Sequence, residues 1–252
     1  MDQVEPGTSE ELESCPFCEG REDRTPPEVF ALPAEGRAPD TPGWRVRVVP
    51  NLYPAFERQE VVIHSPRHVR TFADLTGDEI DLVAEVWRTR TSAEGAGYVH
   101  PLINEGRAAG ASLPHSHSQL VWLPEPPPAV AAERPEALAE LLSAAREQQL
   151  VVAEGDGAIG FCHPVGRLPY ETLIVSEGDA TLAAALRLLR ELVARLLQAE
   201  GAVPWNAWLH HGTAWHIELV PRLSVLAGLE LGAGIYVNSL PPEQAAENLR
   251  GS

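Results

Sequence analysis

The chain contains no lysine, so its 19 basic residues are all arginine. They are outnumbered by 36 acidic residues, which gives a formal net charge of −17 at pH 7. A protein this acidic repels nucleic acids and anionic membranes at long range, so neither is an expected partner. A phosphorylated substrate would therefore need local donors, such as Arg107, backbone amides or a metal ion.

Long hydrophobic runs are also missing. The chain has no run of about eighteen apolar residues and no basic and apolar leader, so it predicts neither a membrane span nor a signal peptide. The expected location is the cytoplasm. Hydrophobic residues make up 44% of the 252 residues and charged residues 22%, which is the profile of a globular protein with one large domain or two ordinary ones.

Cysteine is scarce as well, with three residues in the chain. Three are too few for a disulfide framework, and an odd number leaves one unpaired. Cys15 and Cys18 form a Cys-Pro-Phe-Cys sequence, which is typical of either half a zinc site or a redox pair. A redox pair normally begins a helix after a strand, whereas this pair follows an acidic stretch, so zinc is favoured.

Hydrophobic periodicity predicts a mixture of strands and helices. Strands are expected at 44–49, 60–63, 98–104, 119–123, 150–153, 158–162, 172–175, 205–210 and 215–220. Helices are expected at 76–90, 134–149, 181–198 and 241–250, and Thr76 with Glu79 forms a capping box at the first. Residues 1–14 form an acidic leader without periodicity and are expected to be disordered. The Glu-Pro-Pro-Pro run at 125–128 marks a domain boundary.

The two halves of the chain resemble each other in this order of elements. Each offers strand, turn, strand, capped helix, strand and a short strand that bears histidine. Aligned in this way, His216 matches His115, and Glu218 matches His117. The sequence therefore predicts an internal duplication, with residues 15–124 as the repeat that carries the chemistry and residues 125–252 as a repeat without a nucleophile.

The chemistry is expected in residues 104–119, which read Asn-Glu-Gly-Arg-Ala-Ala-Gly-Ala-Ser-Leu-Pro-His-Ser-His-Ser-Gln. On an extended segment His115, His117 and Gln119 lie on one face, because side chains alternate along a strand. A lone His-x-His pair also occurs in cores and on surfaces without any function. Here a small, flexible run precedes the pair, which favours a phosphate site beside a reactive imidazole. The members of that run are Gly106, Gly110 and Ser112.

Taken in order, these motifs resemble the galactose-1-phosphate uridylyltransferase family of the histidine-triad superfamily. The resemblance covers nearly the whole chain. The residues that carry it are Cys15-Pro-Phe-Cys18, Asn51, Ser65-Pro-Arg-His68, 104–119, Pro169-Tyr-Glu-Thr172, Trp215-His216, Glu230 and 242–246. It implies an α+β, histidine-triad-like fold with two tandem repeats of antiparallel half-barrel sheet and flanking helices, usually in a homodimer.

The resemblance implies a nucleotidyltransferase in which His117 attacks the α-phosphorus of a nucleotide sugar and passes the nucleoside monophosphate to a sugar 1-phosphate. Gln119 would hydrogen-bond the transferring phosphoryl group. Histidine-triad hydrolases have a third histidine there, whereas glutamine cannot deliver a proton at neutral pH, which favours transfer between phosphates over hydrolysis. One alternative is a phosphorylase of an ADP-sugar, a GDP-sugar or a dinucleoside polyphosphate. Another is a non-catalytic, zinc-stabilised nucleotide-binding protein.

The resemblance also implies two metal sites. A structural zinc would be held by Cys15, Cys18, His68 and His115, since two thiolates and two imidazoles close a tetrahedral set. An optional second metal in the C-terminal half would be zinc, iron or manganese. Its matched positions are Glu133, one of His210 and His211, His216, and Glu218 where the family has histidine. The alternative is that these are hydrogen-bonded polar residues without a metal.

Contacts to the nucleotide or sugar are implied for Asn51, Asn104 and Glu230. The other expected substrate-binding residues are Gly106, Arg107, Gly110 and Ser112. The chain departs from the family before Cys15, where members usually carry an arginine-rich segment that helps to bind the nucleotide diphosphate. None of the fourteen residues before Cys15 is basic. This difference strengthens the phosphorylase alternative.

Overall fold

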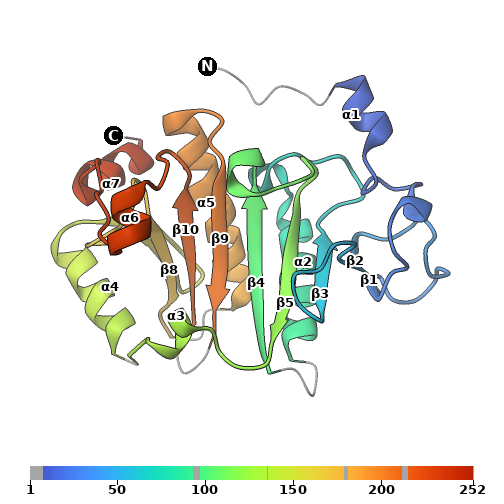
Figure 1. Cartoon of the computed structure of the whole chain (residues 1–252), viewed down its shortest axis with the longest axis horizontal. Coiled ribbons are helices and arrows are strands. Elements are labelled where there is room, and N and C mark those ends of the chain that lie inside the picture. Colours follow the sequence, from blue (N-terminus) through green and yellow to red (C-terminus); the bar gives the residue numbers. More distant parts are fainter. Residues whose placement is uncertain (1–7, 93–96, 135, 179–180, 212–214, 252) are drawn as a thin grey trace.

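The computed structural model describes residues 8–92, 97–134, 136–178, 181–211 and 215–251. Within these residues one antiparallel sheet of ten strands runs through the molecule in the order β1-β2-β3-β5-β4-β9-β10-β8-β7-β6 (Figure 1). The strands are β1 (Phe30–Leu32), β2 (Val46–Pro50), β3 (Gln59–Ile63), β4 (Tyr98–Glu105), β5 (His117–Leu123), β6 (Val151–Gly155), β7 (Ala158–Cys162), β8 (Thr172–Ser176), β9 (Trp205–His210) and β10 (His216–Pro221). The helices are α1 (Ser9–Ser14), α2 (Gly77–Thr91), α3 (Pro128–Ala131), α4 (Ala137–Glu147), α5 (Leu182–Glu200), α6 (Gly228–Ala233) and α7 (Pro242–Arg250).

The two halves of the sheet share one topology. Strands β1 to β5 lie in the order 1-2-3-5-4, and strands β6 to β10 repeat it as 6-7-8-10-9. In each half a long helix follows the third strand, α2 in the first and α5 in the second. The halves meet where β4 pairs with β9, with Leu102 opposite Trp208. The two-repeat α+β architecture expected from the sequence is therefore present.

Helices α2 and α5 cover one face of the sheet and bury the main core between them (Figure 1). The predicted capping box begins α2: the Thr76 side chain accepts from the Glu79 amide, and the Glu79 side chain accepts in return. Helix α5 is capped by Thr181, and its apolar stripe is buried against the sheet. Each fully buried aliphatic side chain contributes roughly 1.5–3 kcal/mol, so this face supplies most of the stability.

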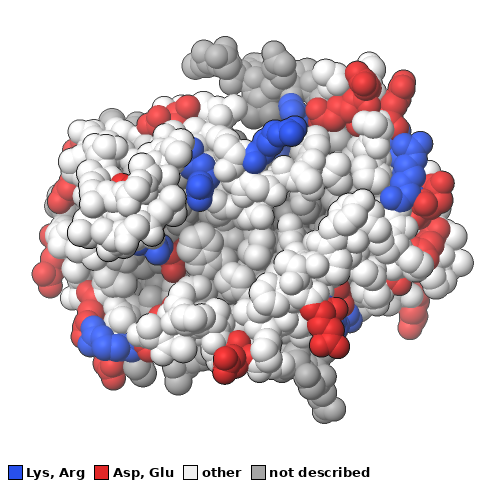
Figure 2. Space-filling view, in the orientation of Figure 1, with Lys and Arg blue, Asp and Glu red and all other residues white. Residues whose placement is uncertain are grey.

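The opposite face of the sheet is covered only in part. A smaller apolar cluster lies over β2 and β3; its buried members are Cys15, Phe17, Ala31, Trp44, Val49, Val61 and Ile63. From β5 to β10 the alternate residues of the same face include His117, Asn104, His210 and His216. Helices α3 and α4 border a cavity over His210 and His216. Figure 2 shows this face hollowed, with charged side chains mainly around its edge. The polar residues of interest therefore share one face of the sheet.

Most predicted elements are present within two or three residues of their expected ends, and the differences lie in short segments. Strand β5 begins at His117, earlier than expected. Residues 9–14 form α1 where disorder was predicted, because Thr8 caps the helix and Glu11 bonds His68. Residues 1–7 lie outside the described part. Strand β1 and helices α3 and α6 fall in stretches without periodicity. None of the described helices has the length and apolar character needed to cross a membrane.

Candidate active site

His117 is the first residue of β5, paired with Ile63 of β3, and its side chain is 6% exposed. Its Nδ1 lies 2.7 Å from the carbonyl oxygen of His115. A carbonyl can only accept, so Nδ1 carries the proton and Nε2 carries the lone pair. Burial lowers the pKa of His117. The residue is therefore a neutral imidazole whose Nε2 is a competent nucleophile near pH 7.

The two serines that flank His117 point to the other face and anchor the strand. Ser118 Oγ accepts from Trp87 Nε1 of α2 at 2.9 Å. Ser116 Oγ lies 2.9 Å from Nδ1 of the fully buried His64. These bonds fix the alternation that directs His115, His117 and Gln119 to the accessible face. The sequence identified the His-x-His pair but offered no signal for His64 or Trp87, which are distant along the chain.

The segment between β4 and β5 forms a compact turn beside His117. Gly106 has φ +84°, and a Cβ there would lie 2.9 Å from Pro204, so only glycine fits. A single 3-10 turn at Arg107–Ala109 follows, and Gly110 ends it in the left-handed region at φ +94°. The turn borders a cavity of about 480 Å³ whose lining includes Arg107 and Ser112. The cavity thus offers an anion the guanidinium of Arg107 and the hydroxyl of Ser112, although Glu11 also lines it. The amides of residues 109–111 donate to carbonyls within the turn instead.

Two amides complete this surface. Gln119 follows His117 on the same face, and its Oε1 accepts from Gln59 Nε2 at 2.5 Å. Asn104 lies at the end of β4, and its Oδ1 accepts from Asn206 Nδ2 at 2.8 Å. The structure thus brings Asn104, Gln119 and His117 together. It also adds Gln59 and Asn206. Sequence reasoning missed both, because only the register of neighbouring strands brings them to the site.

The other two predicted contacts lie further from His117. Asn51 follows β2 and closes a turn by accepting from the Tyr53 amide at 3.0 Å, and Tyr53 is 84% exposed. Glu230 belongs to α6 and accepts from the Ala227 amide at 2.9 Å. Helix α6 lies by β10, and β4 and β9 separate β10 from β5 (Figure 1). Within one chain Glu230 is therefore not brought to His117.

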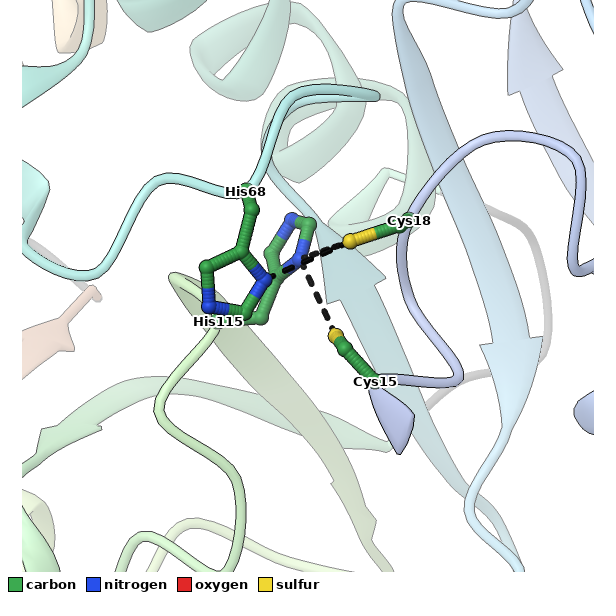
Figure 3. A group of neighbouring side chains, drawn as sticks. All are labelled: Cys15, Cys18, His68 and His115. Carbon is green, nitrogen blue, oxygen red and sulfur yellow. Dashed lines mark hydrogen bonds between the residues drawn. The ribbon is translucent and has the colours of Figure 1, made fainter. Parts of the chain in front are cut away.

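The four residues predicted to hold zinc converge (Figure 3). Their ligand atoms lie within 4.8 Å of one another. Cys18 Sγ is 3.3 Å from His68 Nδ1, and Cys15 Sγ is 3.5 Å from His115 Nδ1. Tetrahedral zinc, with bonds of about 2.3 Å to sulfur and about 2.0 Å to nitrogen, puts these atoms about 3.5 Å apart. The cluster therefore has the dimensions of a closed metal site.

The surroundings of this cluster also suit a metal. The second nitrogen of His68 lies 2.8 Å from the Glu11 carboxylate, and that of His115 lies 2.9 Å from the Ser65 carbonyl. Such partners orient metal-ligating imidazoles in known sites. Burial lowers the pKa of His115 to about 3, which keeps its Nδ1 free to coordinate. Burial and Cys15 raise the pKa of Cys18 to about 12, a cost that a bound cation would remove by stabilising the thiolate.

A second cluster lies in the C-terminal half. His210 Nδ1 is 2.6 Å from Glu133 Oε1, and His216 Nε2 is 3.8 Å from the same oxygen and 3.5 Å from Glu218 Oε1. His211 instead stacks on Tyr98 and bonds the Val99 carbonyl, so of the two candidates His210 faces the cluster. The group borders a cavity of about 470 Å³.

This second cluster differs from a closed metal site in two ways. Glu218 is shared with Arg167, whose guanidinium lies 2.8 Å from it. Nδ1 of His216 is buried and has no hydrogen-bond partner among the described residues. Three carboxylate or imidazole ligands with one side open to a cavity resemble sites that keep an exchangeable position.

The chain is similar to known proteins over most of its length. The family model for the N-terminal domain of galactose-1-phosphate uridyl transferase matches residues 54–221. An ADP-glucose phosphorylase of Arabidopsis thaliana is 27% identical, with 94% of this chain and 81% of the relative covered. The crystal structure of an ADP-glucose phosphorylase from Arabidopsis thaliana with bound ADP-glucose superposes with a TM-score of 0.80 at 26% identity, covering 95% of this chain and 91% of that one.

A galactose-1-phosphate uridylyltransferase of Streptomyces lividans is 26% identical, with 92% of this chain and 81% of the relative covered. The predicted histidine-triad-like α+β fold is confirmed by the extent of the structural match. The predicted enzyme class, a nucleotidyltransferase, agrees with the family model and both kinds of relative. The match to more than half of the chain shows that it belongs to the galactose-1-phosphate uridylyltransferase family.

Proposed function

We propose that the protein transfers a nucleoside monophosphate through a covalent intermediate on His117. The observation that carries this is the bond from His117 Nδ1 to the His115 carbonyl, which leaves Nε2 as the only ring nitrogen with a free lone pair. Nε2 attacks the α-phosphorus of a nucleotide sugar, the bond to the bridging oxygen breaks, and the sugar 1-phosphate leaves. A phosphate oxygen of the acceptor then attacks the same phosphorus, and the imidazole leaves.

The acceptor is a phosphate in this proposal. Gln119 donates a hydrogen bond but cannot protonate a leaving group, and a phosphate leaves without much protonation. Asn104, Arg107 and Ser112 would bind the diphosphate beside the turn formed by Gly106 and Gly110, and Asn51 would bind the nucleoside. Two donor and acceptor pairs are supported.

An ADP-sugar with inorganic phosphate is the first pair, because the relative named ADP-glucose phosphorylase matches 94% of the chain. A UDP-hexose with a hexose 1-phosphate is the second pair. Its support is that the family model and the Streptomyces lividans relative are both named for galactose-1-phosphate uridylyltransferase.

The proposal includes a structural zinc at Cys15, Cys18, His68 and His115. Its support is the spacing of the ligand atoms and the partners of both imidazoles. A bound zinc would hold both cysteines as thiolates and compensate their negative charge. It would also rigidify the segment that leads into β5. Because His115 provides both a ligand nitrogen and the carbonyl that orients His117, the metal would hold the nucleophile in register.

A second metal and a second copy of the chain complete the proposal. Glu133, His210 and His216, with Glu218 beside them, would hold zinc, iron or manganese. The exposed apolar stretch from 223 to 237, in which Val225 is 92% exposed, supports a homodimer. Glu230 lies within this stretch, so its proposed contact to a sugar would be made in the assembled dimer.

Intact mass spectrometry tests the reaction. Wild type and His117→Ala are incubated briefly with ADP-, UDP- and GDP-sugars. The control for loss of an imidazole elsewhere is His211→Ala, because His211 stacks on Tyr98 and does not face the second cluster. A nucleoside monophosphate adduct in wild type and the control, but not in His117→Ala, is expected, and its mass names the nucleotide. Full turnover by His117→Ala would exclude the covalent route. Tight donor binding without any consumption of donor would instead indicate a binding protein.

A further inference from the structure

Two side-chain amides on either side of His117 are held by a second amide each. Gln119 is bonded to Gln59, and Asn104 to Asn206. An amide side chain has one accepting end and one donating end, so its orientation decides what it offers to a substrate. The orientation of both pairs can be deduced from the backbone groups at which each chain of bonds ends.

The Gln59 pair is anchored on a backbone donor. Gln59 Oε1 accepts from the Ala55 amide at 2.8 Å, so its NH2 group must point the other way, to Gln119. Gln119 can then only turn its oxygen toward Gln59. Register explains the contact: Gln59 is paired with Val121, which places it diagonally across from Gln119 on the same face. The NH2 group of Gln119 is left to face the transferring phosphoryl group.

The Asn206 pair is anchored on a backbone acceptor. Asn206 Nδ2 donates to the Ala109 carbonyl at 2.8 Å and to Asn104 Oδ1 at 2.8 Å, which uses both of its hydrogens. Asn104 must therefore turn its oxygen to Asn206 and its NH2 group away from it. The β4 to β5 pairing of Leu102 with Gln119, extended by two residues, places Asn104 beside His117. Both flanking amides thus present N–H groups on the side of the nucleophile.

We infer that Gln59 and Asn206 are positioning residues that hold Gln119 and Asn104 with their NH2 groups toward the phosphate at His117. The inference rests on the proposed nucleotidyl transfer. Preorganised donors stabilise the charge that develops on the phosphoryl oxygens, whereas an inverted amide would present an oxygen and repel it. Asn206 also extends the site across the joint between the repeats, because it belongs to β9 of the second half.

The tests are Gln59→Glu and Asn206→Asp, which keep size and shape but remove the donating end. Each new carboxylate would accept from the NH2 group of its neighbour and invert it. We expect kcat to fall about 10²-fold, the effect of losing one oxyanion donor, with a smaller change in KM. In Gln59→Leu and Asn206→Leu the new side chain neither holds nor inverts the amide of Gln119 or Asn104, so kcat should fall less. Metal content should match wild type in every variant. Thermal midpoints are compared between Asn206→Asp and Asn206→Leu, because both lose the bond to the Ala109 carbonyl.

Double variants separate orientation from added charge. In a Gln119→Ala background Gln59→Glu should have no further effect. In an Asn104→Ala background Asn206→Asp should cost no more than Asn206→Leu, because both lose the bond to the Ala109 carbonyl and neither has an amide left to invert. An undiminished loss in those backgrounds would overturn the inference, because the effect would then come from charge. Full activity of the single Glu and Asp variants, with Gln119→Ala and Asn104→Ala still impaired, would overturn it as well. Failure of nucleotidyl transfer itself would be seen separately, as full turnover by His117→Ala.

Discussion

The two polar clusters of this protein occupy comparable strands of the two repeats but differ in chemistry. The first, near β5, combines two thiols with two imidazoles in a closed set. The second, near β10, combines imidazoles with carboxylates and opens onto a cavity of about 470 Å³. Only the first is joined through the backbone of His115 to a buried, neutral histidine. One topology thus supports a closed cluster beside the proposed nucleophile in one half and a polar cavity in the other.

The largest expected effect is the loss of turnover when His117 is removed, and it tests whether the second repeat can replace the first. His117→Ala should reduce turnover at least about 10³-fold, because nothing else near the phosphate is a comparable nucleophile. Adding Glu218→His to that variant should restore neither turnover nor a covalent adduct, because only residues 211–215 join β9 to β10, whereas the longer segment 106–116, with Arg107 and Ser112, joins β4 to β5. Steady-state kinetics and intact mass are the measurements. An adduct in the double variant would show that the second repeat holds a latent active site.

The second prediction compares the metals. Cys18→Ser should remove zinc and lower the thermal midpoint by roughly 10 °C, since binding free energy at a structural site is folding free energy. His210→Ala should shift the midpoint by only a few degrees, because its cluster is open and lies outside the main core. Metal analysis and calorimetry on both variants measure this. Equal shifts would show that the second cluster is structural as well.

The joint between the repeats provides a pH-dependent prediction. Glu105 of β4 accepts from Trp205 Nε1 of β9 at 3.0 Å, and burial raises its pKa to about 7 from 4.5. The stabilisation of the fold by the neutral Glu105 side chain is complete below pH 4.5, and it is lost as the pH rises through 7. Relative to Glu105→Gln, which stays neutral, wild type should lose up to about 3 kcal/mol across that window. Denaturant unfolding at several pH values measures the difference, and parallel curves would contradict it.

The smallest expected effect compares equivalent helices. Thr76→Ala should cost about 1–2 kcal/mol, because it removes a reciprocal capping box from α2. Thr181→Ala should cost about 1 kcal/mol, because the cap of α5 is a single bond to the Ala184 amide. Unfolding free energies of the two variants provide the comparison. A larger loss for Thr181→Ala would show that stability depends more on the second repeat.

Local patterns determined much of this protein in advance. The period of apolar residues located the long helices and most strands, since amphipathic periodicity is a local property of the chain. Thr76 and Glu79 marked the start of α2 for the same reason. The segment from Asn104 to Gln119 carried the family resemblance and, with it, the nucleotidyltransferase class. The short elements α1, β1, α3 and α6 were missed because each is too short to show an apolar period.

Only the tertiary structure decided which distant residues meet. Strand order brings β3 and β4 to either side of β5, and β9 next to β4, so Gln59 and Asn206 reach the amides beside His117. Register likewise turned His210 toward Glu133 and His211 toward Tyr98. These pairings are separated by up to 113 positions in the chain. No local pattern encodes them, because side-chain alternation tells which face a residue occupies but not which strand lies beside it.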